Sequence, residues 1–223
     1  MKLKFIFTTI ILALTTFACE RETANNQPAT IKITFLHRWN QIIVNNDDFN
    51  SIHFTNAFGN ELSIERLRYL VSDVKLTKNN GETIIINNYS LLDLEDNSTL
   101  SISSNQILNT GSYENISFVL GFKNENNIDG TYPDLNSASW NVPPMLGGGY
   151  HFMQLDGKYI NNDGNEASYN YHLIRAADNP GPNPTFPQDT FIEISLGPIS
   201  ILDSSEVFIS NDLEGSLCSI SQE

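Results

Sequence analysis

The sequence predicts an all-β protein, an antiparallel β-sandwich built as a single domain, and three observations lead to it. Short runs rich in β-branched and aromatic residues recur between clusters of Asn, Asp, Gly and Pro. Apolar residues at helical spacing are scarce by comparison. No internal repeat or Ser/Pro-rich linker divides the chain, and its length suits one hydrophobic core.

The N-terminal segment is typical of an exported lipoprotein. Two lysines precede an apolar run that is too short to cross a bilayer comfortably, and a cysteine, Cys19, follows it. This order predicts a signal peptide at residues 1–19, with Cys19 lipidated after cleavage. Residues 20–30 have no apolar periodicity and predict a flexible tether, so the folded domain is expected at residues 31–223.

The other cysteine of the sequence is Cys218, and it has no partner if Cys19 is acylated. A disulfide between the two cysteines is the alternative, and the mass of the mature protein distinguishes them. Neither arrangement resembles a structural zinc site, because such sites use paired Cys or His residues close in sequence.

The charge of the mature chain excludes one class of partner. Removal of residues 1–19 leaves 10 basic residues against 26 acidic ones, a net charge of −16. Negative charge of this size repels phosphate backbones, so we expect no nucleic acid partner. The acidic residues are scattered along the sequence, as is typical of a solvated surface.

The expected strands follow one another along the whole chain, separated by turn residues such as Asp163-Gly164. They lie at residues 31–37, 62–76, 82–94, 113–122, 150–160, 167–174, 190–197 and, more weakly, 206–210. Two connections, residues 123–149 and 175–189, are longer than ordinary hairpin loops. Because long loops in compact β domains often have functional roles, the first, which contains Trp140, is the main candidate region.

The four histidines of the sequence, His37, His53, His151 and His172, are the candidate metal ligands. No short-range metal motif joins any two of them. A metal site would therefore combine histidines from separate strands. Strand alternation places His37 at the end of the inward-facing row of residues 31–37.

Alternation gives different expectations for the later histidines. His151 shares a face with Met153 and is expected to point inward. A soft-metal site of His151 with Met153 or Met145 would suit copper, whereas core packing is the alternative role for Met153. His172 shares a face with Asn170, which predicts solvent or a polar pocket around it.

No catalytic motif is recognisable in the sequence. It has no GxSxG elbow, no P-loop and no GxGxxG segment, and nothing selects one carboxylate pair among its many acidic residues. The sequence therefore predicts a protein that is not an enzyme.

Five successive segments resemble the MbnP-like copper-binding family, in the form found in Bacteroidetes lipoproteins. They lie at residues 54–76, 89–96, 113–127, 147–159 (GGGYHFMQLDGKY) and 169–173 (YNYHL). The resemblance implies an antiparallel β-sandwich that is exported to the periplasm or cell surface, with the outer membrane as the expected location. It also implies one copper ion held by histidines, for copper acquisition or handling without turnover.

The family's functional residues carry over to particular positions here. His37 falls at the first-strand histidine and His172 at the histidine of the Tyr-His-Leu block, so the resemblance implies these two as copper ligands. The third ligand is Trp140, His151 or solvent. Characterised members also have a tryptophan that is oxidised to kynurenine by a di-haem partner of the peroxidase-like MbnH type, and the candidates here are Trp140 and Trp39.

The sequence departs from the family in two places. Members often have a Met-x-Trp-x-Trp run before the Gly-Tyr block, but here that segment contains a single tryptophan, Trp140. The C-terminal residues 211–223 also differ from the family's final strand. A rival interpretation is a surface lipoprotein that binds a glycan or protein partner through Tyr132, Trp140 and Tyr150, without metal.

Overall fold

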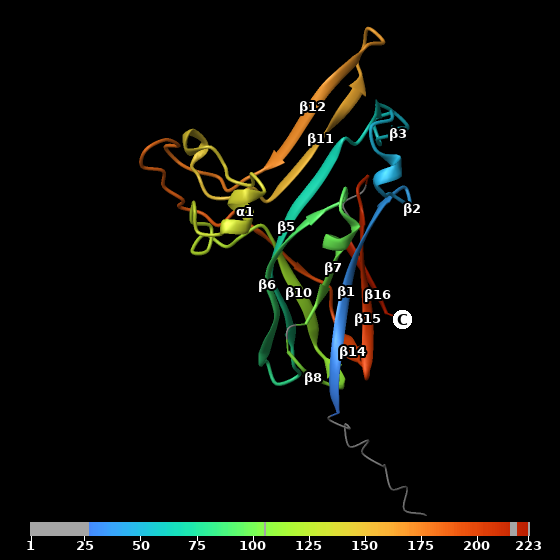
Figure 1. Cartoon of the computed structure of the whole chain (residues 1–223), viewed down its shortest axis with the longest axis vertical. Coiled ribbons are helices and arrows are strands. Elements are labelled where there is room, and N and C mark those ends of the chain that lie inside the picture. Colours follow the sequence, from blue (N-terminus) through green and yellow to red (C-terminus); the bar gives the residue numbers. More distant parts are fainter. Residues whose placement is uncertain (1–26, 105, 215–217, 223) are drawn as a thin grey trace, which may run out of the picture.

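The computed structural model describes residues 27–104, 106–214 and 218–222, which form two packed β-sheets. In these ranges the strands build a six-stranded sheet, an eight-stranded sheet and a two-stranded ribbon. Figure 1 shows β1 and β15 in one layer and β5 and β10 in the other. The predicted all-β sandwich is confirmed, and α1 (Pro133–Ser137) is a single short helix within the described part of the chain.

The first sheet is organised around β1 (Pro28–Trp39). Its alternate residues Ile31, Ile33 and Phe35 are at most 3% exposed, because strand alternation turns one row toward the second sheet. The strands paired with β1 are β15 (Ser204–Asp212), β2 (Ile42–Ile43), β7 (Ser101–Ser103) and β8 (Leu108–Asn109), and β16 (Cys218–Gln222) pairs with β15. The β1–β15 pair is parallel, whereas the other pairings of this sheet are antiparallel.

The second sheet is organised around β5 (Arg66–Thr77). Its direct neighbours are β6 (Thr83–Asp93), β10 (Asn115–Leu120) and β11 (Met153–Ile160). The sheet is completed by β13 (Ile192–Ser195), β12 (Glu166–Leu173), β4 (Glu61–Leu62) and β3 (Phe54–Thr55). The ribbon consists of β9 (Gly111–Tyr113) and β14 (Ile199–Ile201), and the short 3-10 turns are η1 (Asn46–Asp48), η2 (Asn97–Leu100) and η3 (Pro144–Leu146).

The main core fills the space between the two sheets. Phe35 of β1 packs edge-to-face on Phe118 of β10, with ring centroids 5.7 Å apart. Leu67, Val71 and the other inward residues of β5 line the opposite wall. Burial of this apolar surface is the main contribution that favours folding.

A second, smaller apolar cluster lies outside the sandwich, beneath the long loop of residues 123–149. It consists of Leu70, Phe122, Leu135, Trp140 and Tyr150, all at most 3% exposed. Leu70 belongs to β5 but points to the face opposite Val71, away from the main core. The loop is therefore anchored on the outer face of the second sheet, where it forms one wall of the candidate site.

Several boundaries differ from the sequence prediction. Residues 28–30 belong to β1, so the predicted tether extends three residues too far. Residues 218–222, where no family strand was recognised, form β16 on the edge of β15. The strand expected at residues 150–160 begins only at Met153, because the preceding residues bend to follow the loop.

The predicted signal peptide, most of the tether and the lipidation site Cys19 lie outside the described residues. Strands β11 and β12 form a hairpin that extends beyond the body of the sandwich (Figure 1). Within the described ranges, no helix has the length and apolar character needed to cross a membrane.

The packing of β1 gives a stability prediction. Ile33 is fully buried, so Ile33→Ala should lower the free energy of unfolding by about 2–5 kcal/mol through lost apolar contact and a residual cavity. Ile107 is 74% exposed, and Ile107→Ala should change it by less than about 0.5 kcal/mol. Urea denaturation followed by far-UV circular dichroism measures both. Equal effects of the two substitutions would contradict the assigned core.

Candidate metal centre

The outer face of the second sheet presents polar side chains from three adjacent strands. The register pairs Gln154 of β11 with Arg68 of β5 and with His172 of β12. Residues directly opposite in antiparallel strands share a face, so these three side chains lie together. Their neighbours Tyr69 and Met153 pack instead in the main core. His172 therefore faces away from the sandwich interior.

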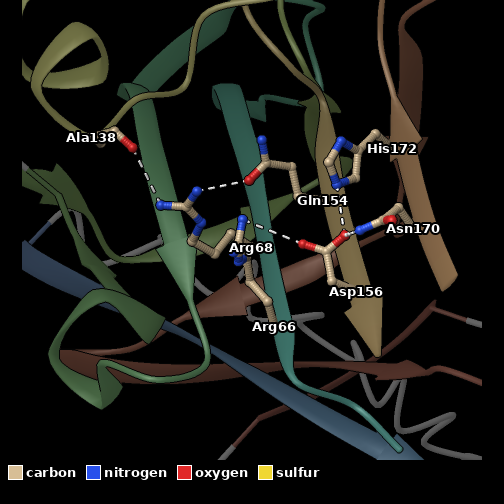
Figure 2. Close-up of polar contacts among 7 residues, drawn as sticks. All are labelled: Arg66, Arg68, Ala138, Gln154, Asp156, Asn170 and His172. Atoms are coloured by element: carbon tan, nitrogen blue, oxygen red, sulfur yellow. Dashed lines mark hydrogen bonds and ion pairs between the residues drawn. The ribbon is translucent and has the colours of Figure 1, made fainter. Parts of the chain in front are cut away.

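Asp156 is the anionic centre of this face. Figure 2 shows its carboxylate between Arg66, Asn170 and His172. Its Oδ1 accepts hydrogen bonds from Asn170 Nδ2 at 2.6 Å and from His172 Nε2 at 2.8 Å, and its Oδ2 lies 3.3 Å from Arg66 Nη1. Burial alone would raise the pKa of Asp156, but the hydrogen bonds from Asn170 and His172 and the nearby positive charges lower it below its ordinary value.

These contacts determine which nitrogen of His172 is available to a ligand. An ionised carboxylate only accepts hydrogen bonds, so His172 Nε2 must carry a proton. In the neutral imidazole, Nδ1 then has a free lone pair. A histidine whose other nitrogen donates to a carboxylate is the usual arrangement for a metal ligand in proteins.

His151 reaches the same place from the end of the long loop. The carbonyl oxygen of Trp140 accepts hydrogen bonds from the backbone N–H of His151 at 3.1 Å and from its Nδ1 at 3.0 Å. Because a carbonyl can only accept, Nδ1 carries the proton and Nε2 has the free lone pair. Burial is the largest influence and lowers the pKa of His151, although the hydrogen bond to the Trp140 carbonyl acts in the opposite direction, so the ring is neutral near pH 7.

The two imidazoles lie next to each other. Their ring centroids are 5.3 Å apart, with the rings nearly perpendicular. In the described part of the chain, neither His151 Nε2 nor His172 Nδ1 has a hydrogen-bond partner. The site thus offers two imidazole nitrogens without a hydrogen-bond partner, and each ring is oriented by an oxygen acceptor at its other nitrogen.

Trp140 closes one side of this pair. Its ring centroid is 5.6 Å from that of His151, its side chain is fully buried, and its Nε1 has no hydrogen-bond partner among the described residues. The guanidinium of Arg68 lies 5.1 Å from the indole centroid and donates a 2.7 Å hydrogen bond to Gln154 Oε1. A cation held over an indole face is attracted by the negative charge of the ring face.

The loop reaches this geometry through its glycines. Gly147, Gly148 and Gly149 all have positive φ angles, between 66° and 110°, which other residues rarely adopt. The N–H of Val142 donates to the Gly149 carbonyl at 2.8 Å, so the segment closes on itself before the chain enters β11. A Cβ on Gly149 would lie 2.5 Å from Asn127 Oδ1, which excludes any larger residue without rearrangement.

The structure places the predicted copper ligand His37 elsewhere. His37 is 2% exposed, and its Nε2 forms a 2.8 Å hydrogen bond with the hydroxyl of Tyr69, an inward-facing residue of β5. His37 and His172 therefore lie on opposite faces of the second sheet. The structure brings His172 together with His151 and Trp140, but it does not bring His37 to them.

The other candidates are also accounted for. His53 is half exposed, with its Nε2 3.9 Å from Asp48 Oδ1. Met153 packs against the main core, which was the alternative role considered for it, and Met145 is 73% exposed. No cluster of three or more His, Cys, Asp or Glu side chains suited to a metal ion occurs in the described ranges.

The rival aromatic platform is not supported by the burial of its residues. Trp140 and Tyr150 are both fully buried, and Tyr150 donates through its hydroxyl to Asn136 Oδ1 at 2.8 Å. Tyr132 stacks on Phe122, with ring centroids 4.6 Å apart. Buried rings offer no face to an external sugar or peptide. The prediction that Trp140 and Tyr150 form part of a binding surface is therefore wrong.

Sequence reasoning missed Asp156, Arg66 and Arg68 as members of the site. The Asp163-Gly164 turn was recognised, and extending the β11–β12 pairing from it places Asp156 opposite Asn170. That register was the available signal for Asp156. The contacts of Arg66 and Arg68 depend on the pairing of β5 with β11, which joins segments far apart in sequence.

Comparison with known proteins identifies the family. The sequence model of the MbnP family matches residues 28–216. The chain belongs to the MbnP family. The structure of MbnP from Methylosinus trichosporium is similar at a TM-score of 0.55 and 13% identity, over 82% of this chain and 76% of that one. This likeness supports the shared MbnP fold, and no curated protein matches the sequence.

The burial of His37 predicts a pH-dependent stability. Burial lowers the pKa of His37 from 6.5 to about 4, so on acidification the unfolded chain takes up this proton first. The unprotonated His37 therefore contributes about 3 kcal/mol to the free energy of unfolding. This contribution is complete above pH 6.5 and is lost as the pH falls to about 4. His37→Gln introduces a side chain that cannot titrate. The free energy of unfolding, measured by urea denaturation, should therefore fall less on acidification in this variant than in the parent chain. His53→Gln is the matched control, and an unchanged pH profile in His37→Gln would refute the assignment.

Proposed function

We propose that this MbnP-family chain binds one copper ion between His151 Nε2 and His172 Nδ1, and that it acquires or handles copper without catalysing a reaction. The observation that carries the proposal is the pair of adjacent imidazoles whose opposite nitrogens are already hydrogen-bonded to Trp140 O and Asp156 Oδ1. Binding would then require little reorganisation of the ligands.

The donor set favours copper over other metal ions. Neutral imidazole is a good ligand for copper, and for zinc, iron and nickel as well. Hard cations such as calcium and magnesium need several oxygen ligands, but the carboxylate of Asp156 is already engaged with Arg66, Asn170 and His172. Copper is also the metal that the family resemblance implies, and monovalent copper accepts a low coordination number.

Trp140 is the better candidate for the oxidised tryptophan that the resemblance implies. It lies beside His151, whereas Trp39 donates through its Nε1 to the carbonyl of Thr55 in β3. The indole N–H is a donor and a poor metal ligand. Oxidative ring opening would break the C2–C3 bond of the indole with oxygen from peroxide or dioxygen, and hydrolysis would release C2 as formate, leaving an amine and a ketone. The proposed catalyst of this oxidation is a di-haem partner of the MbnH type.

The cellular setting remains part of the same proposal. The N-terminal sequence supports export and attachment to the outer membrane through lipid on Cys19, in the periplasm or at the cell surface. The negative net charge supports the absence of a nucleic acid partner.

Substitution of the two histidines tests the proposal. His151→Ala and His172→Ala should each weaken monovalent copper binding by at least about tenfold, because each removes one of two donor nitrogens. Competition with a chromophoric copper chelator under reducing conditions measures the affinity. His53→Ala and His37→Gln are the controls and should bind like the parent chain. No copper uptake by the parent chain, or full affinity in both histidine variants, would contradict the proposal.

The role of Asp156 can be tested separately. Asp156→Asn leaves a side chain of the same shape but removes the charge that holds the proton on His172 Nε2. Copper affinity should fall by about 10- to 100-fold, as for other partners of metal-ligating histidines. Asp163→Asn, in the turn between β11 and β12, is the matched control. An unchanged copper affinity in Asp156→Asn would show that the carboxylate does not orient the His172 imidazole for copper binding.

A further inference from the structure

A separate pocket lies at the end of β1, with lining residues from β1, β2, η1 and β3. Figure 1 shows β2 and β3 close to that end of β1. It has a volume of 290 Å³, close to the lower end of the range for small-molecule sites. Its lining consists of Trp39, Asn40, Ile42, Ile43, Val44, Asp48, His53, Phe54 and Thr55. It therefore contains Trp39 and His53, neither of which belongs to the proposed copper site.

The aromatic walls of this pocket are held in place by packing and one hydrogen bond. Trp39 Nε1 donates to the Thr55 carbonyl at 3.0 Å, which ties the indole to β3. The ring centroid of Phe54 lies 5.0 Å from that of Trp39 and 4.2 Å from that of His53. Phe54 is 5% exposed and joins the pocket to the main core. The pocket thus has preformed aromatic surfaces.

The pocket also has a negative charge without a close positive partner. Asp48 is the one acidic residue of the lining described above, and no Lys or Arg belongs to that lining. Its Oδ2 accepts the backbone N–H of Asn45 at 2.9 Å, and its Oδ1 lies 3.9 Å from His53 Nε2, beyond hydrogen-bond length. The carboxylate therefore retains acceptor capacity toward the pocket.

We infer that this pocket binds a small organic cation of the alkylammonium class. The faces of aromatic rings attract such cations, and the carboxylate of Asp48 supplies the complementary charge. An anion would meet the repulsion of Asp48 and of a chain with a formal net charge of −14. A hard metal ion such as calcium is less suited, because it needs several oxygen ligands and Asp48 is the one carboxylate in the lining.

The experiment compares two probes of nearly the same shape. Choline carries a quaternary ammonium, and 3,3-dimethylbutan-1-ol replaces its charged nitrogen with carbon. We expect choline to bind saturably in calorimetry and to change the fluorescence of Trp39, at about pH 8, where an ordinary imidazole is neutral. The neutral alcohol should bind at least about tenfold more weakly, because it forms neither the cation–π contact nor the ion pair. Equal binding of the two probes, or no saturable binding of choline, overturns the inference.

Variants locate the binding to this pocket. Asp48→Asn and Trp39→Leu should each weaken choline binding by at least about fivefold. Asp47→Asn, an adjacent exposed acid outside the lining, should leave the affinity unchanged. If Trp39→Leu is unstable, Trp39→Phe keeps an aromatic face and should retain part of the affinity. Because the pocket and the copper site share no residue, His172→Ala should bind choline normally, and loss of choline binding in that variant contradicts the assignment.

Discussion

The candidate metal centre depends on the register between β11 and the two strands beside it. This pairing sets Asp156 opposite Asn170 and Arg66, and Gln154 opposite His172 and Arg68. A shift of one residue would exchange the two faces of β11, and would turn this carboxylate into the apolar core. The hydrogen bond from His172 to Asp156, and with it the free Nδ1 of the imidazole, therefore follows from strand pairing.

The site also contains groups that are unfavourable for stability. Trp140 Nε1 and Arg68 Nε are buried without a hydrogen-bond partner in the described ranges, and each such group costs about 1–3 kcal/mol. The sandwich core offsets this cost, because its apolar residues are buried independently of the loop. Buried polar groups without partners in a native structure call for an explanation, and others in the described ranges, such as Ser117 Oγ, lie outside this site. The position of Trp140 and Arg68 around the two histidines fits the proposed role of this region.

The architecture could be predicted from the sequence, but the candidate metal centre could be predicted only in part. Alternating apolar residues and turn signals located the long strands, whereas two-residue strands such as β2 and β3 are too short to show a period. Alternation predicted the polar surroundings of His172 correctly. It did not anticipate the contact of His151 with Trp140 and His172, because regular strand geometry begins only at Met153.

The pairing of His151 with His172 as copper ligands is the central claim. Nitrogen-15 NMR of histidine-labelled protein, with and without one equivalent of monovalent copper, tests it most directly. The account predicts that the Nε2 resonance of His151 and the Nδ1 resonance of His172 shift on loading, while both His37 resonances stay in place. A shift of His37 together with an unperturbed His151 would contradict the account.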